Sequence, residues 1–350
     1  MDLHPRMDLP PLAHLGGRLA TGLVDVTSDP AALDSSGWWA VVRSYEGELV
    51  CARFDDVREA PLPTPTRPAW CGPAAGTWAS SLDETAYRAA VARVREHIAA
   101  GDVYQANVCR VLSALMPDPT RADVVELARL LQTGNPAPYG GVVRLPAAGV
   151  EVATASPELF LRVDGRTVTS RPIKGTGRTA ADISDKDRAE NVMIVDLVRN
   201  DLGVVSETGS VEVPALCALE AHPGLVHLVS TVRATLRDGV GWPELFDATF
   251  PPGSVTGAPK LRALEVLAEV EPTPRGPYCG AVGWVDADRG VGELAVAIRT
   301  FWLQDGRLCF GTGAGITWGS DPRREWDETE LKAERLLAVA SGRGPAGGDA

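Results

Sequence analysis

The sequence lacks the cysteine patterns that hold zinc or build crosslinks. Its six cysteines are scattered, and no two of them form a CxxC pair, so a thiolate zinc site and a disulfide framework are both excluded. The first residues contain no apolar segment typical of a secretory signal. No run of about 18 apolar residues occurs, as a membrane span needs. We therefore expect a cytoplasmic protein without a membrane segment.

An excess of basic residues is also absent. The chain has 46 aspartates and glutamates against 34 lysines and arginines, a net charge of -12. Nucleic-acid binding requires a basic face, so no nucleic-acid partner is expected. A small anionic substrate stays compatible with this charge, because a few cations or a bound metal ion reverse the potential locally.

What is present is an ordinary globular composition, with 350 residues of which 45% are hydrophobic. Helical and strand-like segments are mixed without strict alternation, which predicts an α+β fold with largely antiparallel sheets. Residues 1–13 and 341–350 are expected to be disordered ends. Residues 14–80 are expected to contribute strands, and residues 81–340 to form the main domain.

Apolar periodicity and turn residues predict the individual elements. The expected helices are 81–102, 122–134, 184–202 and 325–340. The expected strands include 38–44, 47–57 and 103–112. Residues 293–316 are expected to form one hairpin that turns at Asp305-Gly306. The proline-rich stretch 58–76 is interpreted as a linker or an irregular crossover.

Two of these helices carry acid pairs near their starts. In 184–202, Asp187 and Glu190 lie on one side, and Glu190 shares the apolar face. A carboxylate on a buried face is costly unless it is paired or binds a metal. Glu325 and Glu328 form a similar i,i+3 pair in the last helix. Carboxylate oxygens are the hard ligands that magnesium takes, so two such pairs indicate a magnesium site. The alternative is that both are ordinary helix starts, where acidic residues are stabilised by the helix dipole and by an i,i+4 ion pair.

Glycine-rich loops form the other candidate sites. Lys174 follows a strand-like run and precedes a Gly-Thr-Gly turn, so it is either a desolvated nucleophile or a surface lysine. The segments FPPGSVTGAPK and FGTGAGITWGSDP lack the context of a P-loop or a dinucleotide loop. They are interpreted as anion-binding backbone or as simple turns. Arg299, expected within an apolar strand, indicates a bound anion.

Ten short segments together resemble the chorismate-utilising enzymes, in the order that this family has. They cover roughly residues 81–340. The segments are GDVYQANVCR, ASPELFL, RPIKGT, DRAENVMIVDLVRNDL, HLVSTV, PPGSVTGAPKLRALE, RGPYCGAVGW, AIRT, GTGAGI and SDPRREWDETELKA. The resemblance implies two packed, largely antiparallel sheets flanked by helices, with the chorismate site in a cleft between the sheets. Residues 81–340 would then be the chorismate-binding catalytic domain.

The resemblance also implies a role for each matching residue. Mg²⁺ would be held by Glu190 and Glu328, with Asp187 and Glu325 beside it. Glu158 matches the family's general acid, which protonates the leaving C4 hydroxyl of chorismate. The implied substrate-binding residues are Gln105, Thr176, His227, Thr256, Tyr278, Arg299, Gly313, Ala314, Gly315 and Lys332.

Two positions distinguish members of the family. Isochorismate and salicylate synthases carry a lysine that activates water where this chain has Gln105, and glutamine cannot act as a base. Anthranilate synthases typically have alanine where this chain has Lys174, whereas aminodeoxychorismate synthases share PIKGT. There the lysine amine attacks C2 and ammonia then displaces it by attack at C4. The resemblance is therefore strongest to aminodeoxychorismate synthase component I, and an anthranilate or 2-amino-2-deoxyisochorismate synthase type is the alternative.

The source of ammonia is expected to be another chain. The sequence contains no nucleophile-elbow cysteine of a glutaminase, so a glutamine amidotransferase subunit is expected as the partner. Formation of 4-aminobenzoate would need a separate lyase. A silent binding homologue is a further alternative, but it predicts loss of site acids, and Glu158, Glu190 and Glu328 are all present.

Overall fold

The computed structural model describes residues 9–64, 70–177, 179–222 and 225–342. The predicted disordered ends therefore lie mostly outside the described residues, as does part of the predicted linker. The first strand, β1 (Leu12–Leu15), begins two residues before the expected N-terminal boundary at residue 14.

The described strands join one antiparallel hydrogen-bonded path that folds back into two layers. The first layer runs through β12 (Glu212–His222), β13 (Leu225–Thr235), β10 (Thr167–Arg171) with β11 (Ile173–Gly177), β9 (Leu159–Asp164), β16 (Val291–Val296), β15 (Ala281–Asp286), β3 (Trp38–Arg43), β4 (Leu49–Glu59) and β2 (Arg18–Thr27). The second runs through β1, β7 (Tyr139–Leu145), β8 (Val150–Ser156), β17 (Thr300–Gln304), β18 (Arg307–Ile316) and β6 (Gln105–Leu115), which also pairs with β5 (Ala79–Ser80) and β14 (Gly257–Ala258). The β1–β2 hairpin connects the two layers.

One buried cluster is shared by the two layers. It contains Val41 of β3 and Val282 of β15 from the first layer, and Val143 of β7 and Val152 of β8 from the second. All four side chains are almost fully buried. Burying a valine of this kind contributes about 1.5–3 kcal/mol, so this interface stabilises the pairing of the layers. The predicted α+β class with packed antiparallel sheets is confirmed.

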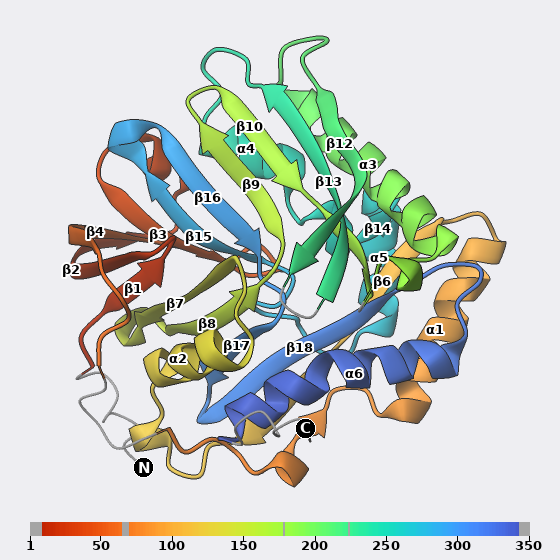
Figure 1. Ribbon diagram of the computed structural model, residues 1–350, viewed down its shortest axis with the longest axis horizontal. Helices are drawn as coiled ribbons and strands as arrows, with labels where there is room; N and C mark the ends of the chain where they lie inside the picture. The colour runs from red at the N-terminus through yellow and green to blue at the C-terminus, as the bar shows by residue number, and fades with distance from the viewer. Residues whose placement is uncertain (1–8, 65–69, 178, 223–224, 343–350) are drawn as a thin grey trace.

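Six α-helices of the described residues cover these sheets (Figure 1). They are α1 (Glu84–Ala99), α2 (Val124–Gly134), α3 (Asp185–Val205), α4 (Trp242–Thr249), α5 (Lys260–Val270) and α6 (Pro322–Ala340). Figure 1 shows α6 lying lengthwise along β18, and α2 packs on β7 and β8. Helices α1 and α5 pack on β6, and α3 packs on β13 with α4 beside it. None of the described helices is long and apolar enough to cross a membrane.

Capping residues set the helix ends close to the predicted ones. Helix α3 begins after Ser184, whose side chain and that of Asp187 form a reciprocal capping box. Helix α6 begins three residues earlier than predicted, because Asp321 caps the N–H groups of Arg323 and Arg324. Short 3-10 turns lie at Pro30–Asp34, Ala75–Thr77, Pro119–Arg121, Pro146–Ala148, Ala180–Asp182, Gly253–Val255 and Ala287–Arg289.

The prediction of a single hairpin over 293–316 was wrong in its first half. The turn at Asp305-Gly306 is present, with positive φ at both residues, and it joins β17 to β18. Residues up to Val296 instead belong to β16, which pairs with β15 and β9 in the other layer. The chain changes layers at Ile298-Arg299, where Arg299 has a φ of 53°. Arg299 therefore lies in a link between strands and not within a strand.

Candidate active site

Lys174 is directed by an irregularity in β11. The pairing of β11 with β13 shifts between Lys174 and Thr176, at Gly175, which has a φ of 76°. A side chain at Gly175 would also collide with Asp187, because an added Cβ would lie 2.9 Å from the Asp187 Cβ. Glycine is thus required there. The Lys174 Nζ donates a hydrogen bond to the Ser254 carbonyl at 3.1 Å.

Glu158 lies next to this lysine in the link between β8 and β9. Its side chain is 4% exposed, and its carboxyl accepts hydrogen bonds from the Ser254 hydroxyl and the Ile173 N–H. Burial raises the pKa of Glu158 to about 7, although the two hydrogen bonds and the Lys174 charge oppose the rise. A carboxyl of this kind exchanges its proton near neutral pH, as a general acid must.

Gln105 completes this part of the site. It is 1% exposed at the start of β6, and its Oε1 has no hydrogen-bond partner among the described residues. An added Cβ at Gly315 would lie 2.3 Å from the Gln105 Nε2 and 3.6 Å from the Lys174 Nζ. The glycine of β18 therefore allows the amide and the amine to lie together. An unpaired buried acceptor costs about 1–3 kcal/mol, so this oxygen is available for a ligand donor.

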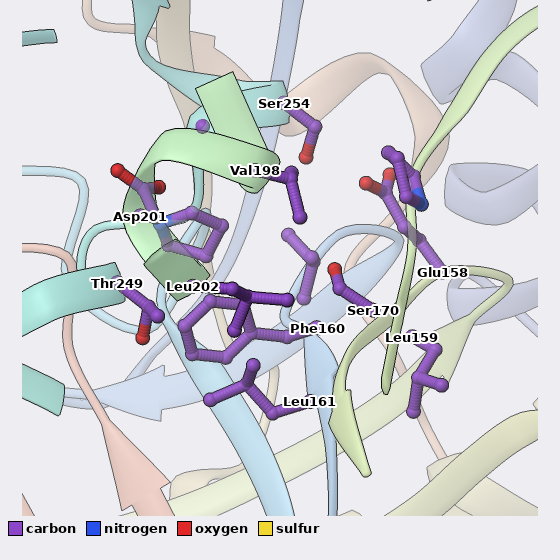
Figure 2. Close-up of a pocket in the computed structure, with 14 residues that line it drawn as sticks. Glu158, Leu159, Phe160, Leu161, Ser170, Val198, Asp201, Leu202, Thr249 and Ser254 are labelled. Carbon is purple, nitrogen blue, oxygen red and sulfur yellow. The ribbon is translucent and has the colours of Figure 1, made fainter. Parts of the chain in front are cut away.

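A small cavity adjoins Glu158 (Figure 2). Its volume is about 20 Å³, which is room for a water molecule. In the view of Figure 2, Glu158 and Asp201 lie on opposite sides of this cavity, with Ser170 and Val198 between them. Burial raises the pKa of Asp201 to about 6, against the effect of Lys260, whose Nζ lies 2.5 Å from the Asp201 carboxylate.

The four predicted metal acids lie on α3 and α6, and Glu190 and Glu325 approach each other across these two helices through Lys186. Glu190 and Glu325 are largely buried, and the Lys186 Nζ lies 3.6 Å from Glu190 and 3.5 Å from Glu325. Burial raises the pKa of Glu190, and Lys174 and Lys186 oppose that rise. Asp187 uses its carboxylate to cap α3, with its Oδ2 2.8 Å from the Ser184 N.

Glu328 lies in a more exposed part of the same acid group. Partial burial would raise its pKa, but Lys332, Lys186 and Lys174 together hold it below the ordinary value. The Lys332 Nζ is 2.7 Å from Glu328 and donates to the Gly313 carbonyl at 3.0 Å. Glu328 is therefore ionised at neutral pH and able to act as a ligand.

These residues fit magnesium in their donor chemistry. Glu190 of α3 and Glu325 of α6 both lie next to one cation, the Lys186 ammonium. Magnesium takes hard oxygen ligands of this kind, together with water and substrate oxygens. The described residues contain no group of three or more close metal-binding side chains. A divalent ion would thus draw Glu190, Glu325 or Glu328 closer and take the rest of its ligands from water and substrate.

The residues predicted to bind a carboxylate lie around β18. Tyr278 is 5% exposed, and its ring packs directly against Gly311. Burial, and to a smaller extent the charge of Arg335, lowers the pKa of Arg299. Among the described side chains, no carboxylate lies near this half-buried guanidinium. A buried arginine without a carboxylate partner favours an anionic ligand. Gly313, Ala314 and Gly315 pair with Cys109, Val108 and Asn107 of β6.

The remaining predicted residues, Thr176, His227 and Thr256, lie in β11, in β13 and in the loop before β14. His227 of β13 is 3% exposed and pairs through its backbone with Thr176, whose side chain lies outside the described part. Thr256 is fully buried and donates its hydroxyl to the carbonyls of Pro252 and Gly253, so its hydroxyl fixes the loop before β14.

Three contributors were not singled out from the sequence. Ser254 contacts both Lys174 and Glu158, yet it appeared only as one letter of a glycine-rich loop. Lys186 has the spacing of an ordinary exposed helix residue, and the Asp201–Lys260 pair joins residues 59 apart. No local pattern reports the contacts of Ser254 with Lys174, of Lys186 with Glu325, or of Lys260 with Asp201. The presence of lysine in a chain that otherwise uses arginine was the available signal.

A model of the chorismate binding enzyme family matches residues 31–338. The chain belongs to this family. The site described above thus lies in a chorismate binding enzyme, and the predicted family membership is confirmed.

Two curated relatives illustrate the range of the family. The chain is 42% identical over 274 residues to anthranilate synthase component 1 of Streptomyces coelicolor, covering 75% of this chain and 52% of the relative. It is 35% identical over 328 residues to aminodeoxychorismate synthase component 1 of Klebsiella aerogenes, covering 89% of this chain and 71% of the relative. The chain spans about half the length of the Streptomyces relative.

Solved structures share the fold. A putative 2,3-dihydroxybenzoate-specific isochorismate synthase from Bacillus anthracis superimposes with a TM-score of 0.78 at 24% identity, covering 97% of each chain. Anthranilate synthase component I from Streptococcus pneumoniae superimposes with a TM-score of 0.75 at 23% identity, covering 94% of this chain and 90% of that one.

Proposed function

We propose that this chain aminates chorismate at C4 to give 4-amino-4-deoxychorismate, as component I of an aminodeoxychorismate synthase. The observation that carries the proposal is the group of Lys174, Glu158 and Gln105, which brings an amine, a proton donor and a free acceptor close together. In this reading the product leads to 4-aminobenzoate, for folate or for another product.

The first step uses Lys174 as the nucleophile. Attack requires the neutral amine, so Lys174 first gives a proton to the Glu158 carboxylate, whose pKa of about 7 allows it to accept and release that proton. The amine nitrogen then bonds to C2, the ring double bond shifts, and the C4–O bond breaks. Glu158 returns the proton to the departing hydroxyl, which leaves as water.

The second step replaces lysine by ammonia. Ammonia attacks C4, the double bond shifts back, and the C2–N bond breaks to release Lys174 as a neutral amine. The free Oε1 of Gln105 accepts an N–H of the incoming ammonia, which orients the ammonia lone pair. Glutamine cannot remove a proton from water, so the site favours ammonia over water as the nucleophile.

Magnesium belongs to the proposal through Glu190 and Glu328, with Asp187 and Glu325 nearby. The ion, when bound, supplies a positive charge that holds the ring carboxylate of chorismate. Arg299 and Tyr278 bind the second carboxylate from the β18 side. The two carboxylates then fix the ring with C2 toward Lys174.

Ammonia is proposed to come from a glutamine amidotransferase subunit. The names of the similar proteins call them component 1, which implies a second component. In the isolated chain, ammonium salt would replace that supply.

A second candidate is an anthranilate synthase type of reaction, with nitrogen at C2. The observation that favours it is the 42% identity to the Streptomyces anthranilate synthase component 1, above the 35% to the aminodeoxychorismate synthases. Against it, a lysine at position 174 would lie in the path of a nucleophile approaching C2.

The test incubates the purified chain with chorismate, Mg²⁺ and ammonium salt at mildly alkaline pH, with mass-detected chromatography of the products. A second sample also receives an aminodeoxychorismate lyase. We expect 4-aminobenzoate only with the lyase, and none from Lys174→Ala. Fluorescent anthranilate, or an amino product that the lyase ignores, would establish the second candidate instead.

A further inference from the structure

Lysine is rare in this chain, and every lysine lies at or beside the site. The sequence has four lysines and thirty arginines. Lys174 lies next to Glu158, Lys332 next to Glu328, and Lys260 pairs with Asp201 beside the cavity. The fourth, Lys186, lies between Glu190 and Glu325. Since arginine is the usual cation of this chain, a lysine at each of these places indicates a need for an ammonium group.

Lys186 has no part in the proposed reaction, yet it has the most central position among the acids. It is the second residue of α3, and its Nζ lies 3.6 Å from the Glu190 Oε1 and 3.5 Å from the Glu325 Oε1. Those two carboxylates come from different helices and have side-chain exposures of only 14% and 6%. The Lys186 side chain is itself 48% exposed, so its stem reaches in from the solvent.

Two buried carboxylates at one place repel each other and lose their hydration. A cation between them is therefore required unless they take up protons. An ammonium is a compact charge on a flexible stem, whereas a guanidinium is planar and larger. A flexible, half-exposed lysine can occupy the position and can also leave it.

Magnesium needs the same position. Its oxygen ligands lie at about 2.0–2.1 Å, so an ion held by Glu190 and Glu328, with Glu325 beside it, would exclude an ammonium from contact with Glu190. A lysine and a divalent ion that neutralise the same carboxylates compete with each other.

We propose that Lys186 is an internal counter-cation of the metal site, which neutralises Glu190 and Glu325 without metal and moves to solvent when a divalent ion binds. This inference rests on the proposed metal site. Lys186 thereby sets the affinity of that site: metal binding must first displace the ammonium. It is a positioning residue and touches no substrate.

The experiment measures binding of Mn²⁺, as a stand-in for Mg²⁺, to the chelator-treated full chain without chorismate. The amount of free Mn²⁺ is read from its electron paramagnetic resonance signal. We expect Lys186→Met to bind Mn²⁺ about 10-fold more tightly than the unmodified chain, because no ammonium has to be displaced. Lys186→Arg, which keeps the charge, should stay within about 3-fold of the unmodified chain or bind more weakly.

Arg199→Met is the matched control for the loss of one positive charge from α3. Arg199 is exposed and pairs with Asp196 on the same helix, 2.9 Å away. It should leave Mn²⁺ affinity within about 2-fold. Thermal unfolding gives an independent reading: with chelator, Lys186→Met should melt below the unmodified chain, and saturating Mg²⁺ should remove that difference. Lys186→Gln replaces the methionine variant if the latter does not fold.

Equal or weaker Mn²⁺ binding by Lys186→Met would overturn the role of Lys186 while leaving the metal site in place. Absence of Mn²⁺ binding in both proteins would overturn the proposed metal site as well. The Glu190→Gln variant separates these results from adventitious binding, because it should lose the Mn²⁺ that the site holds.

Discussion

Glu158 and Glu328 both lie near enough to Lys174 for its charge to act on them, yet their pKa values move in opposite directions. Glu158 is almost fully buried, with two neutral hydrogen-bond donors, and its pKa rises to about 7. Glu328 is half exposed and lies 2.7 Å from Lys332, and its pKa falls. One residue type thus supplies two different chemical groups.

The difference shows that the surroundings of each glutamate decide whether it is protonated or ionised near neutral pH, and so what it can do. A glutamate protonated near neutral pH can give a proton to a leaving group, and a glutamate that stays ionised can bind a metal. Burial without a fixed ion pair raises the pKa and produces the proton-donating glutamate. An adjacent lysine at the protein surface lowers the pKa and produces the ionised glutamate. The following changes test this comparison, from the largest expected effect to the smallest.

Removal of the amine between the two glutamates should have the largest effect. Lys174→Ala should lower the rate of C4 amination by on the order of 10⁴-fold, because the covalent step is lost. The rate of chorismate consumption with saturating ammonium measures it. A loss below 10-fold with product still aminated at C4 would show that ammonia attacks without a lysine adduct.

Removal of the proton donor should come next. Glu158→Gln keeps the shape of the side chain but cannot protonate the leaving hydroxyl, so kcat should fall by about 10³-fold. The same substitution at Glu328 should not abolish turnover when Mg²⁺ is saturating. Single-turnover rates at one pH compare the two variants, and equal losses would contradict the division of roles.

Glu328→Gln should act on the metal requirement. We expect the Mg²⁺ concentration for half-maximal rate to rise by about 10–100-fold, as a ligand is lost. A titration of rate against Mg²⁺ measures this shift, with Glu330→Gln as a control on the same helix. An unchanged midpoint would remove Glu328 from the metal site.

The pH profile should report the raised pKa of Glu158. Its carboxylate form must take up the Lys174 proton before passing it to the hydroxyl, so the rate should rise up to about 10-fold per pH unit as the pH rises toward about 7 and then level off. Glu328, with a lowered pKa, should stay ionised throughout that range. A profile of kcat/KM with saturating Mg²⁺ tests both. A flat profile through pH 7 would show that another group donates the proton.

Stability should respond least, and in an unusual direction. The folded-state pKa of Glu158 lies above the value of about 4.5 in the unfolded chain, so folding binds a proton between these values and stability falls as pH rises from about 4.5 to about 7. Above pH 7 the ionised Glu158 carboxylate lowers the free energy of unfolding by up to about 3 kcal/mol. Below pH 4.5 the carboxyl is protonated in both states and has no such effect. Glu158→Gln should therefore stabilise the protein near pH 8 but not near pH 4.

Urea unfolding at the two pH values measures that difference, with Glu328→Gln as the comparison. Its exposed side chain should give little change at either pH. Destabilisation by Glu158→Gln at alkaline pH would mean that the hydrogen bonds from Ser254 and Ile173 outweigh the burial of charge.

Much of the local structure follows from short patterns. The capping box of Ser184 and Asp187 and the spacing of Glu190 are set within one helix turn, so α3 and its inward acid could be predicted. The turn at Asp305-Gly306 is equally local. The layer change at Arg299 could not be predicted, because apolar alternation continues across it and only the partners of β16 and β17 reveal the break.

Four of the six α-helices of the described residues, the family and the residue types of the site could be predicted from the amino-acid sequence, because capping, periodicity and ordered motifs are local properties of the chain. The tertiary structure alone decided which of those residues share an environment. Glu158 meets Ser254 and Lys174, and Glu190 meets Glu325 through Lys186, only after strands and helices far apart in sequence have packed. A pKa depends on burial and on charges a few ångströms away, and those distances are long-range consequences of folding.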